Sequence, residues 1–239
     1  SDLVNSINEL NAKDDGALYN LSRVYLELNE FDLAIDLLKR AIKLSPKNGA
    51  LYYNLGLAYL NSTKWLMAIK SFKKAAKYLD IEKFSFWSYL YIGDAYYRLG
   101  KYENAVKTYK KVINSNSKKD PDIAHFYLEL GKVYSAKKQY NLALNILEKA
   151  TEKNALIAED LTDEIHYSKA LISFAQGDYL SAIEQLKSAL LTNPEHIDSN
   201  YYLGLVFSIQ GKYCRLNNII FCMINVSRYP KVYFFFNYT

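Results

Sequence analysis

Residues 15–48 read DGALYNLSRVYLELNEFDLAIDLLKRAIKLSPKN, and the pattern in this stretch recurs along the chain. An aromatic residue stands three positions before Ala34, and a bulky residue stands four positions after it. The same arrangement recurs around four more alanines at nearly regular steps, and the full set is Ala34, Ala68, Ala105, Ala143 and Ala182. Steps of 34, 37, 38 and 39 residues indicate a protein built from repeated supersecondary units.

Each unit predicts two helices joined by a short polar turn. Apolar residues recur at i, i+3, i+4 and i+7, which is the spacing of an amphipathic helix. A small residue stands twelve positions before each alanine, and the five are Ser22, Gly56, Gly93, Gly131 and Ala170. Glycine within a helix costs about 0.5–1 kcal/mol relative to alanine. We therefore expect the first helix of each unit (helix A) to approach the second (helix B) closely at these residues.

The pattern resembles the tetratricopeptide repeat, in arrays of the bacterial type. The residues of the first unit that carry the resemblance are Leu18, Leu21, Ser22, Tyr25, Ala34, Leu38, Ala41 and Pro46. The resemblance implies an all-α fold, in which antiparallel helix-turn-helix hairpins stack into a right-handed superhelical solenoid. It implies as well that helices A line a concave groove that binds other proteins.

The repeats predict the organisation of the chain. Residues 1–14 are expected to be the remnant of a preceding helix or an N-terminal cap, and residues 15–213 the solenoid. The expected repeats are 15–48, 49–82, 86–119, 124–157, 163–196 and a partial one at 197–213. The extra residues between units, such as 83–85, are expected to lengthen helix B or its loop. Residues 214–239 form an atypical apolar and basic tail, either a disrupted last repeat or a native cap.

The overall charge of +5 comes mostly from the C-terminal part of the chain. Of the 30 basic and 25 acidic side chains, residues 199–239 hold four basic ones and no acidic one, which leaves residues 1–198 with a net of +1. Hydrophobic residues make up 50% of the chain, which excludes a disordered or collagen-like protein. Lysine runs on helices B are expected to solvate the outer surface, so nucleic acid is not expected as a partner.

Both cysteines, Cys214 and Cys222, lie in the tail, which leaves the body without a disulfide framework. No stretch is long and apolar enough to predict a membrane span. The compartment stays open: the chain is cytoplasmic, or periplasmic or otherwise exported if a leader has been removed.

The groove residues follow from the positions that the family directs inward. The expected partner-binding residues are Tyr19, Arg23, Tyr53, Asn54, Leu57, Trp87, Tyr91, Asp94, Arg98, Glu129, Lys132 and Tyr167. Tyrosine and tryptophan supply rigid amphipathic contact area at interfaces, and the charged residues would set the register of a peptide. The alternative for the aromatic residues is that they pack adjacent helices A together.

These observations predict a non-catalytic scaffold that binds a peptide segment of a partner protein of unknown identity. No catalytic, metal-binding or cofactor-binding residues are expected, because the three histidines are scattered and every glycine has a structural place. The alternative function is a self-assembling repeat protein, in which the C-terminal region pairs one chain with another.

Overall fold

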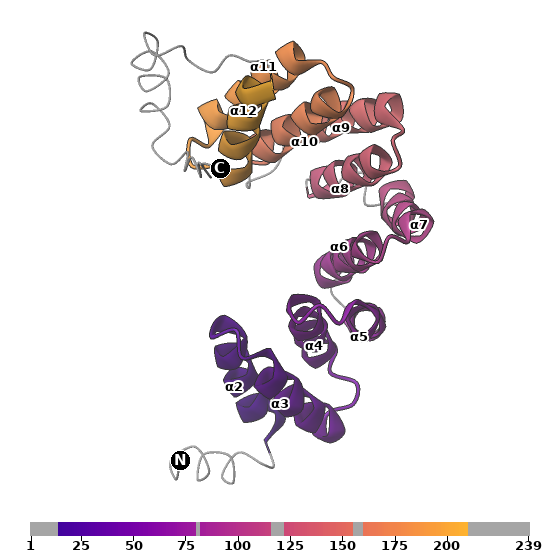
Figure 1. Ribbon diagram of the computed structural model, residues 1–239. Coiled ribbons are helices and arrows are strands. Elements are labelled where there is room, and N and C mark those ends of the chain that lie inside the picture. The colour runs from indigo at the N-terminus through magenta and orange to yellow at the C-terminus, as the bar shows by residue number, and fades with distance from the viewer. Residues whose placement is uncertain (1–13, 80–81, 116–121, 155–159, 210–239) are drawn as a thin grey trace. The chain divides into compact units, whose positions relative to one another are not determined.

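The computed structural model describes residues 14–79, 82–115, 122–154 and 160–209. Every element in these ranges is an α-helix, and successive helices pack in pairs (Figure 1). The predicted all-helical fold of helix-turn-helix repeats is therefore confirmed. The expectations for residues 1–13 and for the tail at 214–239 lie outside the described residues.

The helices alternate between the two roles predicted for each unit. Helices A are α2 (Asp15–Glu27), α4 (Gly49–Asn61), α6 (Glu82–Arg98), α8 (Ile123–Ala136), α10 (Thr162–Ala175) and α12 (Ile197–Ile209). Helices B are α3 (Phe31–Leu44), α5 (Trp65–Tyr78), α7 (Tyr102–Asn114), α9 (Tyr140–Asn154) and α11 (Tyr179–Thr192). The described residues thus contain five hairpins and helix A of a sixth.

The turn inside each hairpin has one backbone residue in the left-handed region. These residues are Asn29, Thr63, Gly100, Lys138 and Gly177, with φ between 58° and 77°. The steps between them along the chain are the same as those between the repeat alanines. The left-handed conformation costs most residues about 1–2 kcal/mol. Since only two of the five are glycine, the packing of the flanking helices dictates this turn.

Polar caps mark where the first two helices A begin. The Asp14 Oδ1 atom accepts a hydrogen bond from the Gly16 N–H at 2.9 Å, and Asn48 Oδ1 accepts from the Ala50 N–H at 3.1 Å. An acceptor at this position satisfies one of the unpaired N–H groups of the first helical turn. The two caps occupy corresponding repeat positions, so both helices start at the same point of the repeat.

The expectation for the extra residues at 83–85 was wrong. Helix α5 ends at Tyr78, where Leu79 turns to an extended conformation, and this is the repeat position at which α3 ends after Leu44. Helix α6 begins at Glu82, four positions before the predicted start of the third unit. Helix B of the second unit ends at the same repeat position as helix B of the first. The extra residues therefore lengthen helix A of the third unit.

Helices A and B approach each other closely at the small residues, as predicted. A Cβ atom at Gly56 would lie 2.7 Å from the Phe72 ring, and one at Gly131 would lie 2.7 Å from Leu147. A Cβ atom at Gly93 would collide with the ring of Tyr109. Each of these hairpins therefore closes by placing a bulky side chain of helix B on the bare backbone of helix A.

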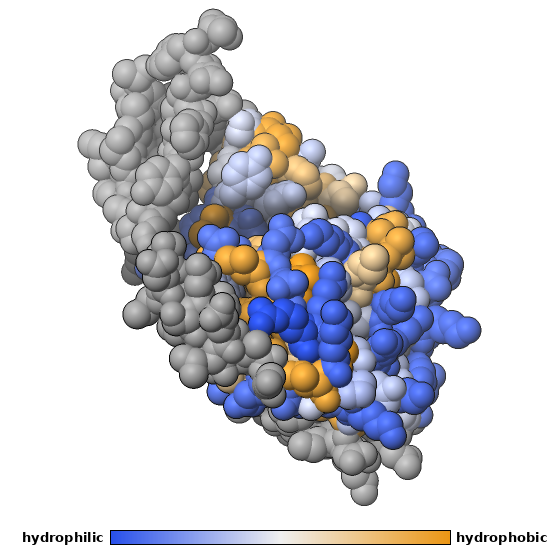
Figure 2. All heavy atoms as spheres, turned by 90° about the horizontal axis from the view of Figure 1, so that it is seen from below, coloured by the Kyte–Doolittle hydropathy of each residue, from blue (hydrophilic) through white to orange (hydrophobic). Residues whose placement is uncertain are grey.

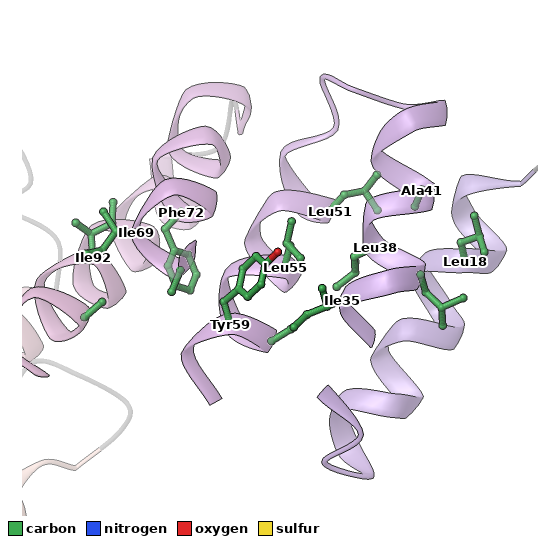
Figure 3. Packing of buried hydrophobic residues seen from close by; sticks show 14 residues of the cluster. Leu18, Ile35, Leu38, Ala41, Leu51, Leu55, Tyr59, Ile69, Phe72 and Ile92 are labelled. Atoms are coloured by element: carbon green, nitrogen blue, oxygen red, sulfur yellow. The ribbon is translucent and has the colours of Figure 1, made fainter. Parts of the chain in front are cut away.

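The helices form two compact units, of which unit 1 is Ser1–Ser115 and unit 2 is Asn116–Thr239. Unit 1 contains α2–α7, and its core is one cluster that includes Leu18 of α2, Leu38 of α3 and Leu51 of α4 (Figure 3). The core continues along the unit to Phe72 of α5 and Ile92 of α6. Consecutive hairpins of unit 1 are thus joined by continuous apolar packing.

Unit 2 contains α8–α12. One of its clusters joins Ala170 of α10, Ala182 and Leu186 of α11 and Val206 of α12, with Tyr167 and other rings packed against it. Among the residues that the structure describes, none of the helices has the length and apolar character needed to span a membrane.

Candidate functional site

All twelve predicted partner-binding residues lie on helices A. In unit 1, Tyr19 and Arg23 lie on α2, and Tyr53, Asn54 and Leu57 on α4; Trp87, Tyr91, Asp94 and Arg98 lie on α6. In unit 2, Glu129 and Lys132 lie on α8, and Tyr167 lies on α10. Some of these side chains pack against neighbouring helices, and others are exposed to solvent.

Tyr53 and Tyr91 belong to an aromatic cluster that joins three helices. The Tyr91 ring stacks on Phe72 of α5 at 5.1 Å between centroids, and Tyr53 meets both rings edge-on at 5.7 and 6.0 Å. Burial, together with the adjacent Tyr91 hydroxyl, raises the pKa of Tyr53 well above its ordinary value. The rings of Tyr53 and Tyr91 therefore contact each other across successive helices A.

A polar contact and an apolar one complete the link between α2 and α4. The Asn54 Nδ2 atom donates to the Tyr19 hydroxyl at 3.4 Å and to the Ala50 carbonyl at 3.0 Å. Leu57 is half-buried and packs against the core of unit 1, as does Tyr19. We call the side of a unit on which the predicted binding residues of helices A lie its helix A face. Tyr19, Asn54 and Leu57 are partly buried there, whereas Arg23 of α2 is exposed to solvent.

Arg98 is an exposed but well-anchored charge on the helix A face of unit 1. Its Nε atom donates to both carboxylate oxygens of Asp94 at 3.2 Å, and its guanidinium lies 5.5 Å from the ring centroid of Trp65 on α5. The Arg98 side chain nevertheless keeps 55% of its surface exposed. A guanidinium has five N–H donors, so four remain on the two Nη atoms beyond the bond to Asp94.

Trp87 is also on α6, one turn before Tyr91. Its ring meets the neighbouring Phe86 edge-on at 5.8 Å. The structure therefore brings together Tyr53 with Tyr91, Tyr19 with Asn54, and Asp94 with Arg98, while Trp87 lies beside Phe86 on its own helix.

Unit 2 has a charged network in addition to its aromatic contacts. The Lys132 Nζ atom lies 2.9 Å from Glu129 Oε1 on the same helix and 3.4 Å from Glu164 Oε2 on α10. Burial alone would lower the pKa of Lys132, but the two carboxylates outweigh it and raise the pKa above its ordinary value. Lys132 is therefore charged at neutral pH and ties α8 to α10.

The network continues to α12 through His196. Its Nε2 atom lies 3.4 Å from Glu164 Oε1, and its Nδ1 atom accepts a hydrogen bond from the Ser199 N–H at 3.0 Å. The Tyr167 ring lies 5.1 Å from His196 and 5.8 Å from Tyr202. Burial, and the negative charge of Asp198 after it, raises the pKa of Tyr167 above its ordinary value.

Sequence reasoning missed three residues of these faces. Trp65 is the aromatic residue three positions before Ala68 and served only to mark the repeat, although its ring supports the Arg98 guanidinium. Glu164 occupies the second position of its unit, which is one of the inward positions and could have been found from the spacing alone. His196 was not assigned to the site, and the structure shows that its ring is buried and caps the start of α12.

The described residues contain no cluster of three or more His, Cys, Asp or Glu side chains that could hold a metal ion. The polar side chains of the helix A faces are instead arranged in pairs and short chains. Such an arrangement can orient a bound peptide through hydrogen bonds and charges.

Family models match three stretches of the chain. Residues 22–62 match a model described as TPR repeat, and residues 84–153 and 167–213 match models described as tetratricopeptide repeat. Together these stretches cover about two thirds of the chain.

A curated relative is tetratricopeptide repeat protein 8 of Caenorhabditis elegans, which is 25% identical over 134 residues. The match covers 56% of this chain and 25% of the relative, so this chain spans about a quarter of that protein's length.

Several solved structures share the fold. TTC0263 from Thermus thermophilus has a TM-score of 0.61 at 21% identity, over 81% of this chain and 98% of that one. MamA from Desulfovibrio magneticus RS-1 has a TM-score of 0.60 at 19% identity, over 77% and 98% of the two chains. YrrB, a TPR protein with an unusual peptide-binding site, has a TM-score of 0.54 at 17% identity, over 83% and 96%. With the repeated pattern, the hairpins and the family models in agreement, this chain belongs to the tetratricopeptide repeat family, whose members generally act as protein-interaction modules.

Proposed function

We propose that the helix A face of unit 1 binds a peptide segment of a partner protein, and that the chain works as a non-catalytic scaffold. Tetratricopeptide repeats are typically non-catalytic, and the matched family models are all of this kind. The similarity in fold to YrrB, which has a peptide-binding site, supports the same class of ligand here.

The observation that carries the proposal is the arrangement around Arg98. Asp94 and Trp65 hold its guanidinium in place, so little side-chain entropy is lost when a ligand binds. Its Nη donors match the two oxygens of a peptide carboxylate, in the bidentate geometry that arginine favours. Leu57 and the half-buried edges of Tyr53 and Tyr91 provide apolar surface on the same side of helices A. The ligand that fits is a peptide with one carboxylate flanked by apolar side chains.

A peptide display selection against the chain, followed by calorimetric titration of the selected peptides, tests this proposal. Arg98→Ala is expected to weaken binding at least tenfold, which corresponds to about 1.4 kcal/mol. Arg98→Lys should recover little of the affinity, because lysine cannot form the two-pronged contact. The matched control is Lys187→Ala, which removes an exposed positive charge on α11 of unit 2, with an expected change below twofold. Equal losses in Arg98→Ala and Lys187→Ala would refute a site on the helix A face.

Self-assembly is the second candidate, and the exposed face of α2 favours it. Val24 is 49% exposed, whereas Ala58, which occupies the same repeat position on α4, is fully buried. Leu28, which follows the last turn of α2, is 62% exposed. Figure 2 views the molecule from the side of α2 and α3, and hydrophobic side chains are visible there among hydrophilic ones. A repeat face with exposed apolar side chains of this kind can stack on a second copy of the chain.

The concentration dependence of the mass separates the two candidates. If the chain self-assembles through this face, the wild type should gain mass with concentration, and Val24→Lys with Leu28→Lys should remain monomeric. The matched pair of substitutions is Leu66→Lys with Met67→Lys, exposed positions on α5. A wild-type chain that is monomeric throughout would exclude self-assembly through this face.

A further inference from the structure

The outer sides of helices B in unit 1 are strongly basic. Lys70, Lys73, Lys74 and Lys77 of α5 are spaced i, i+3, i+4 and i+7, so they lie on one side of the helix, and all four are exposed. This helix contains no acidic residue. The four lysines span about 10 Å along the helix axis.

The same repeat positions are basic on the neighbouring helices B. On α7 they hold Lys107, Lys110 and Lys111, one repeat after their counterparts on α5. On α3 they hold Lys39, Arg40 and Lys43, together with Asp36. We call these ten basic side chains of α3, α5 and α7 the lysine face. The balanced charge of residues 1–198 hides this face, because it averages over both units.

Unit 2 shows that the repeat does not require this charge. The same positions on α9 hold Glu148, Lys149 and Glu152, and those on α11 hold Glu184 and Lys187 as their only charged residues. The helix B face of unit 2 is therefore slightly acidic or neutral. Solvation of an amphipathic helix explains charges of either sign, but it does not explain why one sign predominates at the same positions of three successive helices.

Several lysines of the lysine face lie over tyrosine rings of neighbouring helices. Lys39 lies 6.0 Å from the Tyr59 ring and Lys73 lies 5.8 Å from the Tyr96 ring, and each of these contacts reaches the helix A of the next hairpin.

Two further contacts lie within hairpins. Lys74 lies 4.9 Å from the Tyr52 ring, and Lys111 lies 4.6 Å from the Tyr89 ring while its Nζ donates to the Tyr89 hydroxyl at 3.0 Å. These contacts hold the positive charges at fixed places along α3–α7.

We propose that the lysine face is a second docking surface, and that it binds an acidic polypeptide segment rich in glutamate and aspartate. Charge complementarity selects a polyanion. All but one of the basic residues are lysines, which act as point charges without the two-pronged geometry of arginine for phosphate. The tyrosine rings are covered by lysines, so they are not open for the base stacking by which proteins hold single-stranded nucleic acids. A run of carboxylates is therefore the matching partner.

A fluorescein-labelled decaglutamate peptide is the probe, and its fluorescence anisotropy with the full chain measures binding at 50 mM and 300 mM NaCl. The test variant is Lys70→Glu with Lys107→Glu, and the ring contacts and ion pairs described above include neither residue. Lys149→Glu with Lys187→Glu is the matched control, since it makes the same change in net charge at helix B positions of unit 2. Circular dichroism of both variants confirms folding, and Lys70→Gln with Lys107→Gln replaces the test variant if it unfolds.

We expect the wild type to bind decaglutamate at low salt and to lose most of this affinity at high salt. The test variant should bind at least tenfold more weakly than the control variant, and Arg98→Ala should bind like the wild type. Equal losses in the two charge-matched variants would overturn the proposal, because they would indicate only an effect of net charge. Tighter binding of a short DNA duplex, lost in the same test variant, would overturn it in favour of a nucleic-acid surface.

Discussion

Units 1 and 2 share an edge-on tyrosine contact between successive helices A, Tyr53 with Tyr91 and Tyr167 with Tyr202, but unit 2 adds buried charged contacts between its hairpins. In unit 1 the seventh repeat position is apolar, as in Leu55 and Ile92, and the rings of Tyr53 on α4 and Tyr91 on α6 meet edge-on. In unit 2 the seventh position of the fifth repeat is Lys169, whose amine lies 2.9 Å from Glu148 Oε1 on α9. The comparison shows that the contact between small and bulky residues within a hairpin defines the repeat, whereas the contacts between hairpins can be aromatic or charged.

The largest loss of stability is expected at the contact between Gly93 of helix A and Tyr109 of helix B, where an added Cβ atom cannot be accommodated. Gly93→Ala would push a Cβ atom into the ring of Tyr109, which is fully buried and cannot move aside. We expect a loss of about 2–4 kcal/mol in the free energy of unfolding, measured by urea titration followed by circular dichroism.

The matched position in unit 2 provides the control. Ala170 occupies the place of Gly93 and packs near Leu186 in the same cluster. Ala170→Gly should cost only about 1 kcal/mol, mainly through backbone entropy. If Gly93→Ala is as stable as the wild type, the close approach of α6 and α7 is not what specifies glycine there.

The second largest change in stability is expected at the buried Lys169 of unit 2. Lys169 is only 9% exposed, and its amine is bound by Glu148 and by Thr151 Oγ1 at 3.3 Å. Glu148→Ala should cost about 1–2 kcal/mol, because it leaves a buried charge without its carboxylate. Lys169→Leu, which restores the apolar residue of the other units, should be neutral or stabilising. Thermal unfolding of the two variants checks this order, and a reversed order would show that the ion pair is worth more than apolar packing.

The third effect is a difference in alkaline stability. The pKa of Tyr53 is raised in the folded chain, so the unfolded chain releases this proton first as the pH rises. The stabilising effect is complete below the ordinary tyrosine pKa of about 10 and is lost as the pH rises above it.

Between pH 9 and pH 11 the wild type should therefore lose more stability than Tyr53→Phe, by at most about 1 kcal/mol, because the ring is only half-buried. Urea titrations at the two pH values measure the difference. Tyr201→Phe, at an exposed ring of α12, should follow the wild type. Parallel curves for all three chains would contradict the role of Tyr53.

The smallest effect is expected at a lysine–tyrosine contact. Lys111→Met keeps an unbranched side chain but removes the ammonium that lies over Tyr89, and we expect a loss of about 0.5 kcal/mol. Lys107→Met, on the same helix but outside the described ring contacts, should change the stability less. Differential scanning calorimetry can resolve this pair, and equal midpoints would mean that the contact contributes nothing to stability.

The sequence predicted the repeat and its hairpins because each unit shows its whole pattern within one short stretch of the chain. The small residues at Gly56, Gly93 and Gly131 were interpreted correctly, since a glycine at the same point of several helices has a common cause. The start of α6 at Glu82 could not be predicted in the same way. The extra residues can extend either helix, and only the packing of the neighbouring hairpins decides between them.

The candidate site was harder to predict, since family positions say which way a side chain points but not what it meets. Tyr53 and Tyr91 were expected in the groove, and their rings pack on Phe72 because neighbouring helices A lie close enough for them to meet. The support that Trp65 gives to Arg98 depends on a contact between successive hairpins that no local pattern shows. The lysine runs on helices B were visible in the sequence, but they were interpreted as solvation because the charge of residues 1–198 is nearly balanced.

The packing of each helix on its neighbours in the chain has a consequence for folding. Within unit 1 and within unit 2, contacting residues are separated by one or two helices, so the contact order is low and the loops to be closed are short. Folding can begin at any hairpin and spread to the next, and hydrogen exchange should be slowest for hairpins that are covered on both sides. Because Val24 of α2 is 49% exposed and its repeat counterpart Ala58 of α4 is fully buried, we expect the amides of α2 to exchange faster than those of α4.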